Sequence, residues 1–231
     1  MSKQFLGVIL IIIVVLVGIF ALTGNKLSQT SSNGSSTGTL TQHVEGQGTT
    51  GVTLVEYGDY QCPYCGQYFP TVKQVVAEYG DKIKFQFRNF PLTGLHQNAF
   101  AAARAAEAAG LQNKFWEMND VLYQTQSQWS NAGDPTTTFD QYAQQLGLNL
   151  SRYKTDYASS KVNDLINADE AEGNKLGIQG TPTFFLDGKQ IQVANAASAF
   201  EKLINAEIAK KAGSSTAAPA SAGQTSQTPA Q

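Results

Sequence analysis

Both cysteines of this 231-residue chain stand in a single Cys-x-x-Cys motif, Cys62-Pro63-Tyr64-Cys65. The apolar run Val52–Tyr57 precedes the motif and has the composition of a buried central strand. After the motif, apolar side chains recur at helical spacing as far as Tyr79, and Gly80 ends the pattern. A pair of thiols between a strand and a helix constrains the fold and the chemistry more than any other feature of the chain.

Two cysteines at this spacing make either a redox pair or half of a metal site, and they cannot make a disulfide framework. A tetrahedral zinc site needs four ligands. Besides carboxylates, the chain offers only His43 and His96, and neither lies at a recognisable metal spacing from the cysteines. We therefore expect a redox pair, with no metal and no cofactor. The remaining alternative is that the two cysteines are simply small buried residues.

The positions of the two thiols predict separate roles. Cys62 comes just before the helix, where unpaired N–H groups and the positive end of the helix dipole lower the pKa of a thiol. We expect Cys62 to be the nucleophile. Pro63 suits the first helical turn, because its missing N–H costs nothing there. Cys65 follows one turn later and is placed to resolve a mixed disulfide by attacking the Cys62 sulfur.

Glu56 lies in the expected central strand, six residues before Cys62. A buried carboxyl group there has a raised pKa, and we interpret Glu56 as the proton acceptor for Cys65. The alternative is that strand alternation turns Glu56 toward solvent. The dipeptide Thr181-Pro182 precedes another strand, where a proline usually marks a trans boundary.

The two histidines and two tryptophans have weaker claims to function. His96 is able to stabilise a thiolate, but a single histidine before a helix is more often a cap or a surface group. His43 lies close to the N-terminal linker and has a weaker case still. Trp116 and Trp129 are expected in the core of a helical region.

Residues 5–22 form an uncharged run of 18 residues, about long enough for a helix that spans a membrane. The run exceeds the roughly 7–15-residue core of a cleavable signal peptide, and no A-x-A cleavage site follows it. We therefore expect residues 1–24 to be a cytoplasmic start and an uncleaved transmembrane signal anchor, with a cleaved signal peptide as the alternative. Lys3 precedes the run, which places the rest of the chain outside the cytoplasm.

Two low-complexity segments flank a single expected domain. Residues 25–40 are rich in Ser, Thr, Gly and Asn and predict a flexible linker, whereas residues 213–231 predict a disordered tail. Residues 41–212 are enough for one domain with a sizeable core. The formal net charge is −2, and no basic patch appears, so we expect no nucleic-acid partner.

Hydrophobic periodicity divides residues 41–212 into a β-α-β unit, a helical block at about 95–176, and a β-β-α unit, which together indicate an α/β fold. Ile83–Arg88 alternates as a strand and should run parallel to the first strand. Asp187-Gly188 is a two-residue hairpin signal. Helices are expected over 95–109, 112–126, 138–146, 150–158, 161–176 and 197–211.

Several motifs occur along the domain in the same order as in one known family, between about Val52 and Lys211. Long stretches of sequence separate them, so the set is far more specific than Cys-x-x-Cys alone. The motifs are Val52–Cys65, Asn89–Leu92 before an Ala-rich helix, Lys114–Met118, and Gly177–Phe185.

In these motifs the chain resembles the DsbA-like thioredoxin-fold family of thiol:disulfide oxidoreductases. The resemblance implies a thioredoxin fold with a helical domain inserted after the first βαβ unit. It also implies a cis peptide at Thr181–Pro182, facing a redox-active Cys62–Cys65 disulfide. The site residues that it supports are Cys62 as nucleophile, Cys65 as resolving thiol, Glu56 as buried acid, and Thr181, Pro182, Pro63 and Tyr64 as substrate contacts.

The resemblance further implies an enzyme that donates its disulfide to reduced exported proteins and is reoxidised by a quinone-linked membrane partner. Tyr64 is a departure, because the strongest oxidants have Pro-His between the cysteines, and a neutral tyrosine adds no positive charge beside the thiolate. We interpret the chain as a single-pass, membrane-anchored oxidase with an extracytoplasmic catalytic domain. Two alternatives stay open: a reductase in the same location, and a non-enzymatic tethered binding module whose disulfide is structural.

Overall fold

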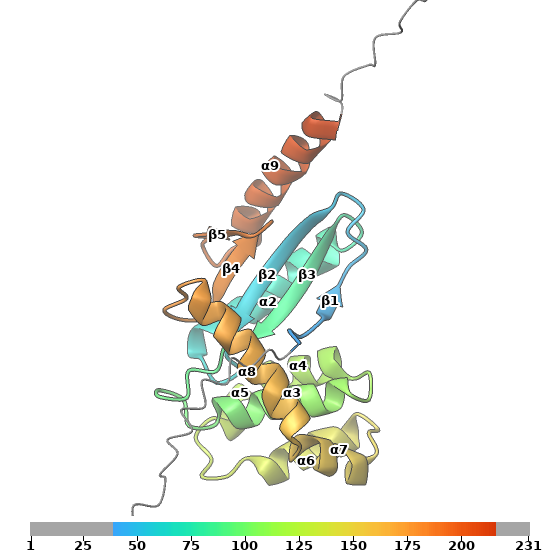
Figure 1. Cartoon of the computed structure of the whole chain (residues 1–231), viewed down its shortest axis with the longest axis vertical. Coiled ribbons are helices and arrows are strands. Elements are labelled where there is room, and N and C mark those ends of the chain that lie inside the picture. Colours follow the sequence, from blue (N-terminus) through green and yellow to red (C-terminus); the bar gives the residue numbers. More distant parts are fainter. Residues whose placement is uncertain (1–38, 216–231) are drawn as a thin grey trace, which may run out of the picture. The chain divides into compact units, whose positions relative to one another are not determined.

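The computed structural model describes residues 39–215, so the expected anchor at residues 5–22 lies outside the described range. Within that range, no helix is long and apolar enough to cross a membrane. A five-stranded sheet has the strand order β1-β3-β2-β4-β5 (Figure 1). The strands are β1 His43–Glu45, β2 Val52–Gly58, β3 Ile83–Asn89, β4 Thr183–Leu186 and β5 Lys189–Ile191, and the helices are α2 Pro63–Tyr79, α3 Ala99–Gly110, α4 Phe115–Gln124, α5 Gln126–Trp129, α6 Thr136–Gln145, α7 Leu150–Tyr157, α8 Ser160–Lys175 and α9 Ala197–Ser215.

The central strand of the sheet is β2, which leads directly into the thiol motif. It pairs in parallel with β3, with Val52 opposite Ile83, and antiparallel with β4, with Leu54 opposite Leu186. The parallel pairing confirms the prediction from the strand, helix, strand pattern. Because β2 has a hydrogen-bonded neighbour on both sides, the end of this strand is a rigid platform for the residues that follow.

The hairpin between β4 and β5 confirms the turn predicted at Asp187-Gly188. Both residues have positive φ angles, +48° for Asp187 and +77° for Gly188. Positive φ at both central positions is the geometry of a type I′ turn, whose twist suits a two-residue hairpin.

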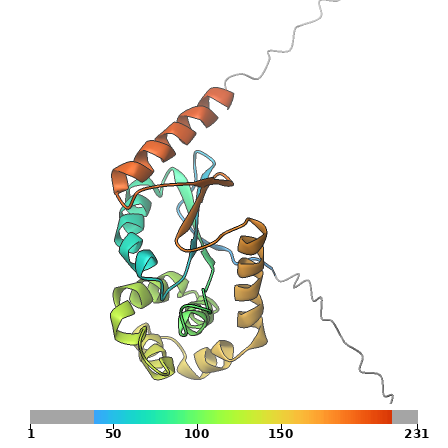
Figure 2. The same cartoon turned by 90° about the vertical axis from the view of Figure 1, so that its left-hand side faces the viewer.

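Helices cover both faces of the sheet (Figure 2). One face packs against α2 and α9, where Val75, Phe200 and Ile204 are buried with Leu54 and Phe184. The helix α8 lies on the other face and contacts β3. This sheet with helices on both sides has the layered architecture expected of an α/β fold.

The segment between β3 and β4 holds the helices α3 to α8 and no strand, and its core is shared with β3 and the thiol loop through Phe87, Tyr60 and the two cysteines. The helix α3 lies at the centre of this block and contacts α4, α6, α7 and α8 (Figure 2). Alanine side chains let neighbouring helices approach closely, which explains the Ala-rich sequence of α3. Its buried alanines are Ala99, Ala102, Ala103, Ala105, Ala106, Ala108 and Ala109.

The structure corrects several predicted boundaries. The strand β1 was not expected, because three residues are too few to show a periodic pattern. The helix expected from residue 95 begins at Ala99, since His96 N–H and Leu95 N–H donate to the Leu92 carbonyl in turns instead. The helix expected over 112–126 begins only at Phe115.

A buried charge cluster fastens the start of the domain to the sheet. The Asp169 carboxylate is fully buried and accepts hydrogen bonds from Thr41 N–H at 3.0 Å, the Thr41 hydroxyl at 2.6 Å and Asn89 N–H at 3.0 Å. Arg88 Nη1 donates to the same carboxylate at 3.0 Å and to the Thr41 carbonyl at 2.9 Å. These bonds hold the segment before β1 against β3 and α8.

Replacing Asp169 by asparagine should therefore destabilise the domain strongly. The substitution leaves the Arg88 charge buried without a counter-charge, a change that costs about 3 kcal/mol or more. Denaturant unfolding of the purified chain measures the loss. Asp164→Asn on the exposed side of the same helix removes one charge in a solvated position and serves as the control. Equal unfolding curves for the two variants would contradict the cluster's structural role.

Candidate active site

The thiol motif lies where β2 ends and α2 begins. Cys62 is the N-cap of α2 and Pro63 is its first residue. Cys62 N–H donates to the Asp59 carbonyl at 3.1 Å, and the Cys62 carbonyl accepts from Gly66 N–H at 3.1 Å. These two bonds fix the turn that carries Cys62 from strand to helix.

The two sulfurs are free thiols in environments that push their pKa values apart. The pKa of Cys62 is lowered to about 5, mainly by the hydrogen bond from the Cys65 thiol. The Thr181 side chain and the N–H groups of Cys65 and Tyr64 add to this effect, while burial opposes it. The helix N-terminus thus contributes as the sequence predicts, but the neighbouring thiol contributes more.

Cys65 is fully buried, whereas Cys62 is 4% exposed. Burial raises the pKa of the Cys65 thiol well above its ordinary value, and the hydrogen bond to Cys62 and the Glu56 carboxyl raise it further. Two coupled thiols, one ionised and one protonated, are the arrangement needed for stepwise disulfide exchange.

The loop before β4 forms the wall opposite Cys62. The Thr181–Pro182 peptide bond is cis, as the family resemblance implies. The Cys62 thiol donates a hydrogen bond to the Thr181 carbonyl at 3.3 Å. The structure therefore brings Cys62, Thr181 and Pro182 together from opposite ends of the domain.

Because the Thr181 side chain helps to lower the pKa of Cys62, Thr181→Val should raise that pKa above its value of about 5. A single hydrogen bond contributes about 1 kcal/mol, so the increase should be about one pH unit or less. The pH dependence of Cys62 alkylation in the reduced protein gives the midpoint. Thr183→Val, two residues along the same strand end, is the control, and a midpoint shared by both variants would contradict this contribution.

Glu56 is buried, which agrees with the first interpretation of this residue and not with the solvent-facing alternative. It lies in β2 between Phe87 of β3 and Phe184 of β4. Burial, followed by the Cys62 thiolate, raises the pKa of Glu56 to about 8. Its side chain lines a cavity of about 10 Å³, close to the smallest volume that holds one water molecule.

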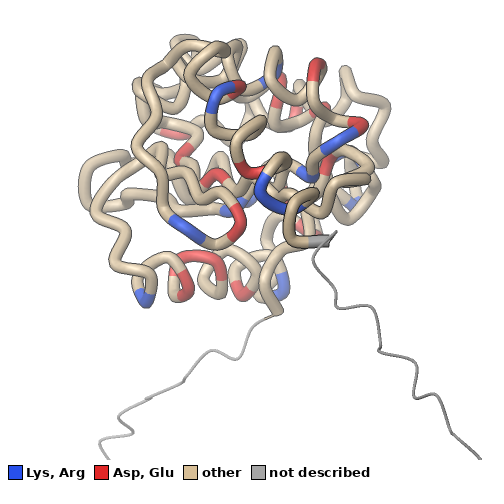
Figure 3. The backbone as a smooth tube through the Cα atoms, turned by 90° about the horizontal axis from the view of Figure 1, so that it is seen from above, with Lys and Arg blue, Asp and Glu red and all other residues tan. Residues whose placement is uncertain are grey.

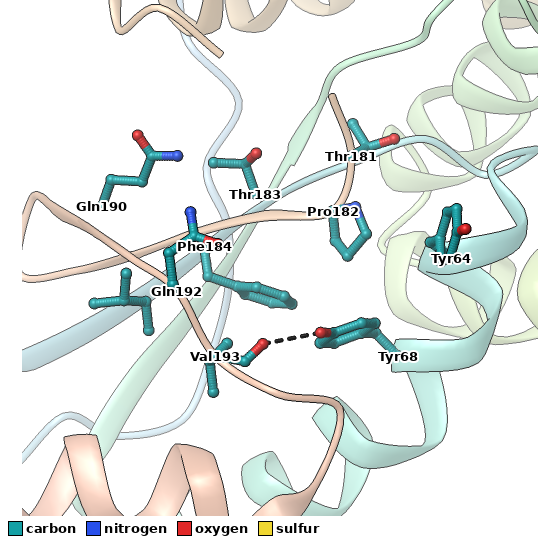
Figure 4. Close-up of a pocket in the computed structure, with 10 residues that line it drawn as sticks. Tyr64, Tyr68, Thr181, Pro182, Thr183, Phe184, Gln190, Gln192 and Val193 are labelled. Atoms are coloured by element: carbon teal, nitrogen blue, oxygen red, sulfur yellow. Dashed lines mark hydrogen bonds between the residues drawn. The ribbon is translucent and has the colours of Figure 1, made fainter. Parts of the chain in front are cut away.

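A shallow hollow of about 210 Å³ lies beside the thiol motif (Figure 4). Tyr64 and Tyr68 of α2 form one side, and the Tyr68 hydroxyl donates to the Val193 carbonyl at 2.9 Å. Tyr64 is 65% exposed, so it is accessible to a partner protein. The opposite side consists of the uncharged residues Thr181, Pro182, Thr183, Phe184, Gln190, Ile191, Gln192 and Val193.

The helical block contributes directly to the thiol loop through Gln126. Its side-chain amide donates to the Tyr60 carbonyl at 2.7 Å and to the Cys62 carbonyl at 2.9 Å. A Cβ atom at Gly66 would lie 2.7 Å from Gln126 Oε1, so a glycine is needed there for this contact. No sequence motif points to Gln126, because its partners are backbone carbonyls more than 60 residues away.

The structure also places the remaining candidates from the sequence. His43 stacks on Phe115 and contacts the Glu107 carboxylate at 2.9 Å, far along the chain from the thiol motif. Trp129 is fully buried in the helical core, as expected, and Trp116 packs against that core. His96 contacts the carboxylate of Asp59, which lies three residues before Cys62. Within residues 39–215 no group of His, Cys, Asp and Glu side chains is arranged to hold a metal ion.

Comparison with known proteins places this site in a family. A family model described as Thioredoxin matches residues 38–206. The chain belongs to the thioredoxin family. Solved structures, among them a thioredoxin-like oxidoreductase and a thiol-disulfide exchange protein, share its fold.

For three of these structures, the alignment covers most of this chain and most of the matched chain. A thioredoxin-like oxidoreductase from Silicibacter pomeroyi DSS-3 is 26% identical, with a TM-score of 0.60, over 71% of this chain and 91% of that one. Oxidised BdbD from Bacillus subtilis is 24% identical, with a TM-score of 0.63, over 73% and 93%. The thiol-disulfide exchange protein alpha-DsbA2 from Wolbachia pipientis is 20% identical, with a TM-score of 0.61, over 71% and 86%.

Among curated proteins, the chain is similar to part of much longer relatives. Na(+)/H(+) antiporter NhaA 1 from Mycolicibacterium gilvum is 37% identical over 152 residues, which are 64% of this chain and 24% of that protein. NhaA 1 from Salinispora arenicola is 39% identical over 148 residues, 64% of this chain and 22% of that protein. The chain thus spans about a quarter of the length of these relatives. Their name applies to the whole proteins, most of which has no counterpart in this chain.

Proposed function

We propose that the protein is an extracytoplasmic thiol:disulfide oxidase that donates the Cys62–Cys65 disulfide to reduced exported proteins. A substrate thiolate attacks the Cys62 sulfur, the Cys62–Cys65 bond breaks, and Cys65 leaves with the electron pair and takes up a proton. A second substrate thiolate then attacks the substrate sulfur of the mixed disulfide and releases the Cys62 thiolate. The substrate loses two electrons and the enzyme gains them.

The observation that carries this proposal is the pKa of about 5 at Cys62, opposite the Thr181–Pro182 wall. A low thiol pKa stabilises the reduced enzyme and makes Cys62 a good leaving group, so the disulfide tends to pass to the substrate. In this chain the stabilisation comes from the Cys65 thiol and backbone N–H groups, without a cation at Tyr64. This supports an oxidase in spite of the Pro-Tyr pair.

The surface around Cys62 supports protein substrates of varied sequence. The hollow beside Tyr64 has no charged lining residue (Figure 4). Lys and Arg are interspersed with Asp and Glu along the described chain (Figure 3). Because the hollow beside the thiols has no charged lining residue, selection of substrates by charge is not expected there, and recognition would depend on the Thr181–Pro182 segment, Pro63 and Tyr64.

Measurement of the reduction potential tests the direction. The full chain is equilibrated with glutathione buffers, and the fractions of dithiol and disulfide are determined by thiol trapping. A value near about −120 mV supports the oxidase, whereas a value near about −270 mV, as in thioredoxin, supports the reductase and overturns the proposed direction. Thr181→Val should lower the potential relative to the wild type, because it destabilises the Cys62 thiolate.

We place the catalytic domain outside the cytoplasm because the uncharged run at residues 5–22 precedes it in the sequence. Such a position would put the thiols within reach of a membrane redox partner that reoxidises them. Alkaline extraction and protease treatment of intact cells that express the full chain test this location. Release of the protein from membranes by alkali would contradict the anchor. Protection of the catalytic domain from added protease, after any outer membrane or cell wall has been removed, would contradict the extracytoplasmic location.

A further inference from the structure

The backbone of Asp59 contacts both cysteines through its two flanking peptide groups. Its N–H donates to the Cys65 sulfur at 3.5 Å, and its carbonyl accepts from Cys62 N–H at 3.1 Å. Asp59 occupies the position between the end of β2 at Gly58 and the thiol loop. A shift of the Asp59 backbone would therefore change both the surroundings of the Cys65 sulfur and the turn that carries Cys62.

The Cys65 sulfur depends on this contact, because the other groups that face it disfavour its ionisation. Burial, Cys62 and Glu56 all raise the pKa of Cys65, and the Asp59 N–H is the group that lowers it. Tyr123 also faces Cys65 and is kept protonated by burial. When the enzyme is reoxidised, Cys65 must ionise to attack Cys62, so the direction of the Asp59 N–H bears on that step.

Three donors hold the Asp59 carboxylate in place. Gln61 N–H donates to Oδ1 at 2.7 Å, while Leu92 N–H at 2.9 Å and His96 Nδ1 at 2.7 Å both contact Oδ2. The carboxylate is fully buried and accepts only, so Nδ1 of His96 carries the proton in this bond. Two of the three donors come from the segment between β3 and α3, so this segment fixes a residue of the thiol loop.

We propose that His96 is a positioning residue for disulfide exchange, which acts through the Asp59 carboxylate to keep the Asp59 N–H directed at the Cys65 sulfur. The proposal rests on the proposed function and adds a residue to it. A hydrogen bond to a buried carboxylate is stronger than one between neutral groups. Its loss should therefore loosen the Asp59 peptide more than the loss of a surface contact in the same segment.

The step to measure is closure of a mixed disulfide in the reduced full chain treated with glutathione disulfide. The Cys62 thiolate attacks one glutathione sulfur, forms the Cys62–glutathione bond and releases one glutathione thiolate. Cys65 then loses its proton and attacks the Cys62 sulfur, which forms the Cys62–Cys65 bond and releases the second glutathione thiolate. The two enzyme thiols are oxidised, and one glutathione disulfide is reduced to two thiols.

Three variants separate positioning from general damage. His96→Ala removes the donor, His96→Asn keeps an N–H donor near the position of Nδ1, and Thr93→Ala changes an exposed residue of the same segment. Acid quenching and mass spectrometry give the rate of mixed-disulfide formation and the lifetime of the mixed disulfide. We expect His96→Ala to lengthen the lifetime about three- to tenfold, His96→Asn to restore most of the rate, and Thr93→Ala to match the wild type.

The formation rate should change much less than the closure rate, because the groups that lower the pKa of Cys62 are Cys65, Thr181 and Tyr64, and His96 is not among them. Equal mixed-disulfide lifetimes for His96→Ala and Thr93→Ala would overturn the role of His96. The proposed function would stand in that case, provided that the wild type forms and closes the mixed disulfide. Equal slowing of formation and closure, or an asparagine variant as slow as the alanine variant, would reduce His96 to a structural residue. A wild type that forms no mixed disulfide would instead refute the proposed function, and this role of His96 with it.

Discussion

Cys65→Ser should accumulate a mixed disulfide when it is treated with glutathione disulfide or a substrate disulfide, with release of one thiol, whereas Cys62→Ser should form none. Cys62 keeps a small exposed fraction of 4% and its pKa is lowered to about 5, while Cys65 is fully buried and its pKa is raised well above the ordinary value. Without Cys65, nothing within the protein resolves the bond at Cys62. Without Cys62, the exchange rate should fall below about one hundredth of the wild-type rate, since buried thiols are inert.

Non-reducing electrophoresis and mass spectrometry of the two variants measure the trapped species. Both variants replace a single sulfur by oxygen, at positions that are three residues apart, so each variant is the control for the other. The lower pKa of Cys62 also lowers the intrinsic reactivity of its thiolate, which offsets much of the gain from ionisation. The lower pKa therefore accounts for only part of the asymmetry, and the complete burial of Cys65 adds to it. Oxidation of reduced substrates at an unchanged rate by Cys62→Ser would instead favour the tethered binding module.

The parts of the fold that depend on local pattern were predictable from the sequence. The apolar run of β2, the alternation of β3 and the Asp187-Gly188 turn each encode an element within a few residues. The strand β1 depends instead on Asp169, which lies more than 120 residues from Thr41 and binds it. Contacts of that kind leave no periodic trace in the sequence.

The candidate site was predictable in its chemistry but not in its supporting contacts. Cys62, Cys65 and Glu56 are recognisable because side chains of these types stand at fixed spacing across the end of a strand and the start of a helix. The cis geometry before Pro182 is a minority conformation that propensity does not identify. Asp59 lies three residues before Cys62, but its proposed role at Cys65 depends on a contact with His96. The sequence favoured a cap or surface position for that histidine.

Glu56→Gln should stabilise the reduced protein at alkaline pH and have little effect in acid. The folded protein holds the pKa of Glu56 at about 8, against an ordinary value of 4.5. Between these values the unfolded chain has released a proton that the folded chain retains, so native stability falls as the pH rises through this window. The difference corresponds to about 5 kcal/mol at pH values above both, and glutamine removes that cost because it has no charge to bury.

Denaturant unfolding of the reduced wild type and Glu56→Gln at about pH 4, pH 6 and pH 8.5 tests this expectation, since these values lie around the titration window. Glu78→Gln changes an exposed carboxyl group on α2 and serves as the control. The Cys62 thiolate is the second cause of the raised pKa, so the stabilisation should be smaller in the oxidised protein, where that charge is gone. A stability difference that is constant across this pH range would contradict a buried, titrating Glu56. The same variant should slow closure of the mixed disulfide, in which the Cys62 charge that raises the pKa of Glu56 is gone, because the amide cannot accept the proton of Cys65 as we interpret Glu56 to do.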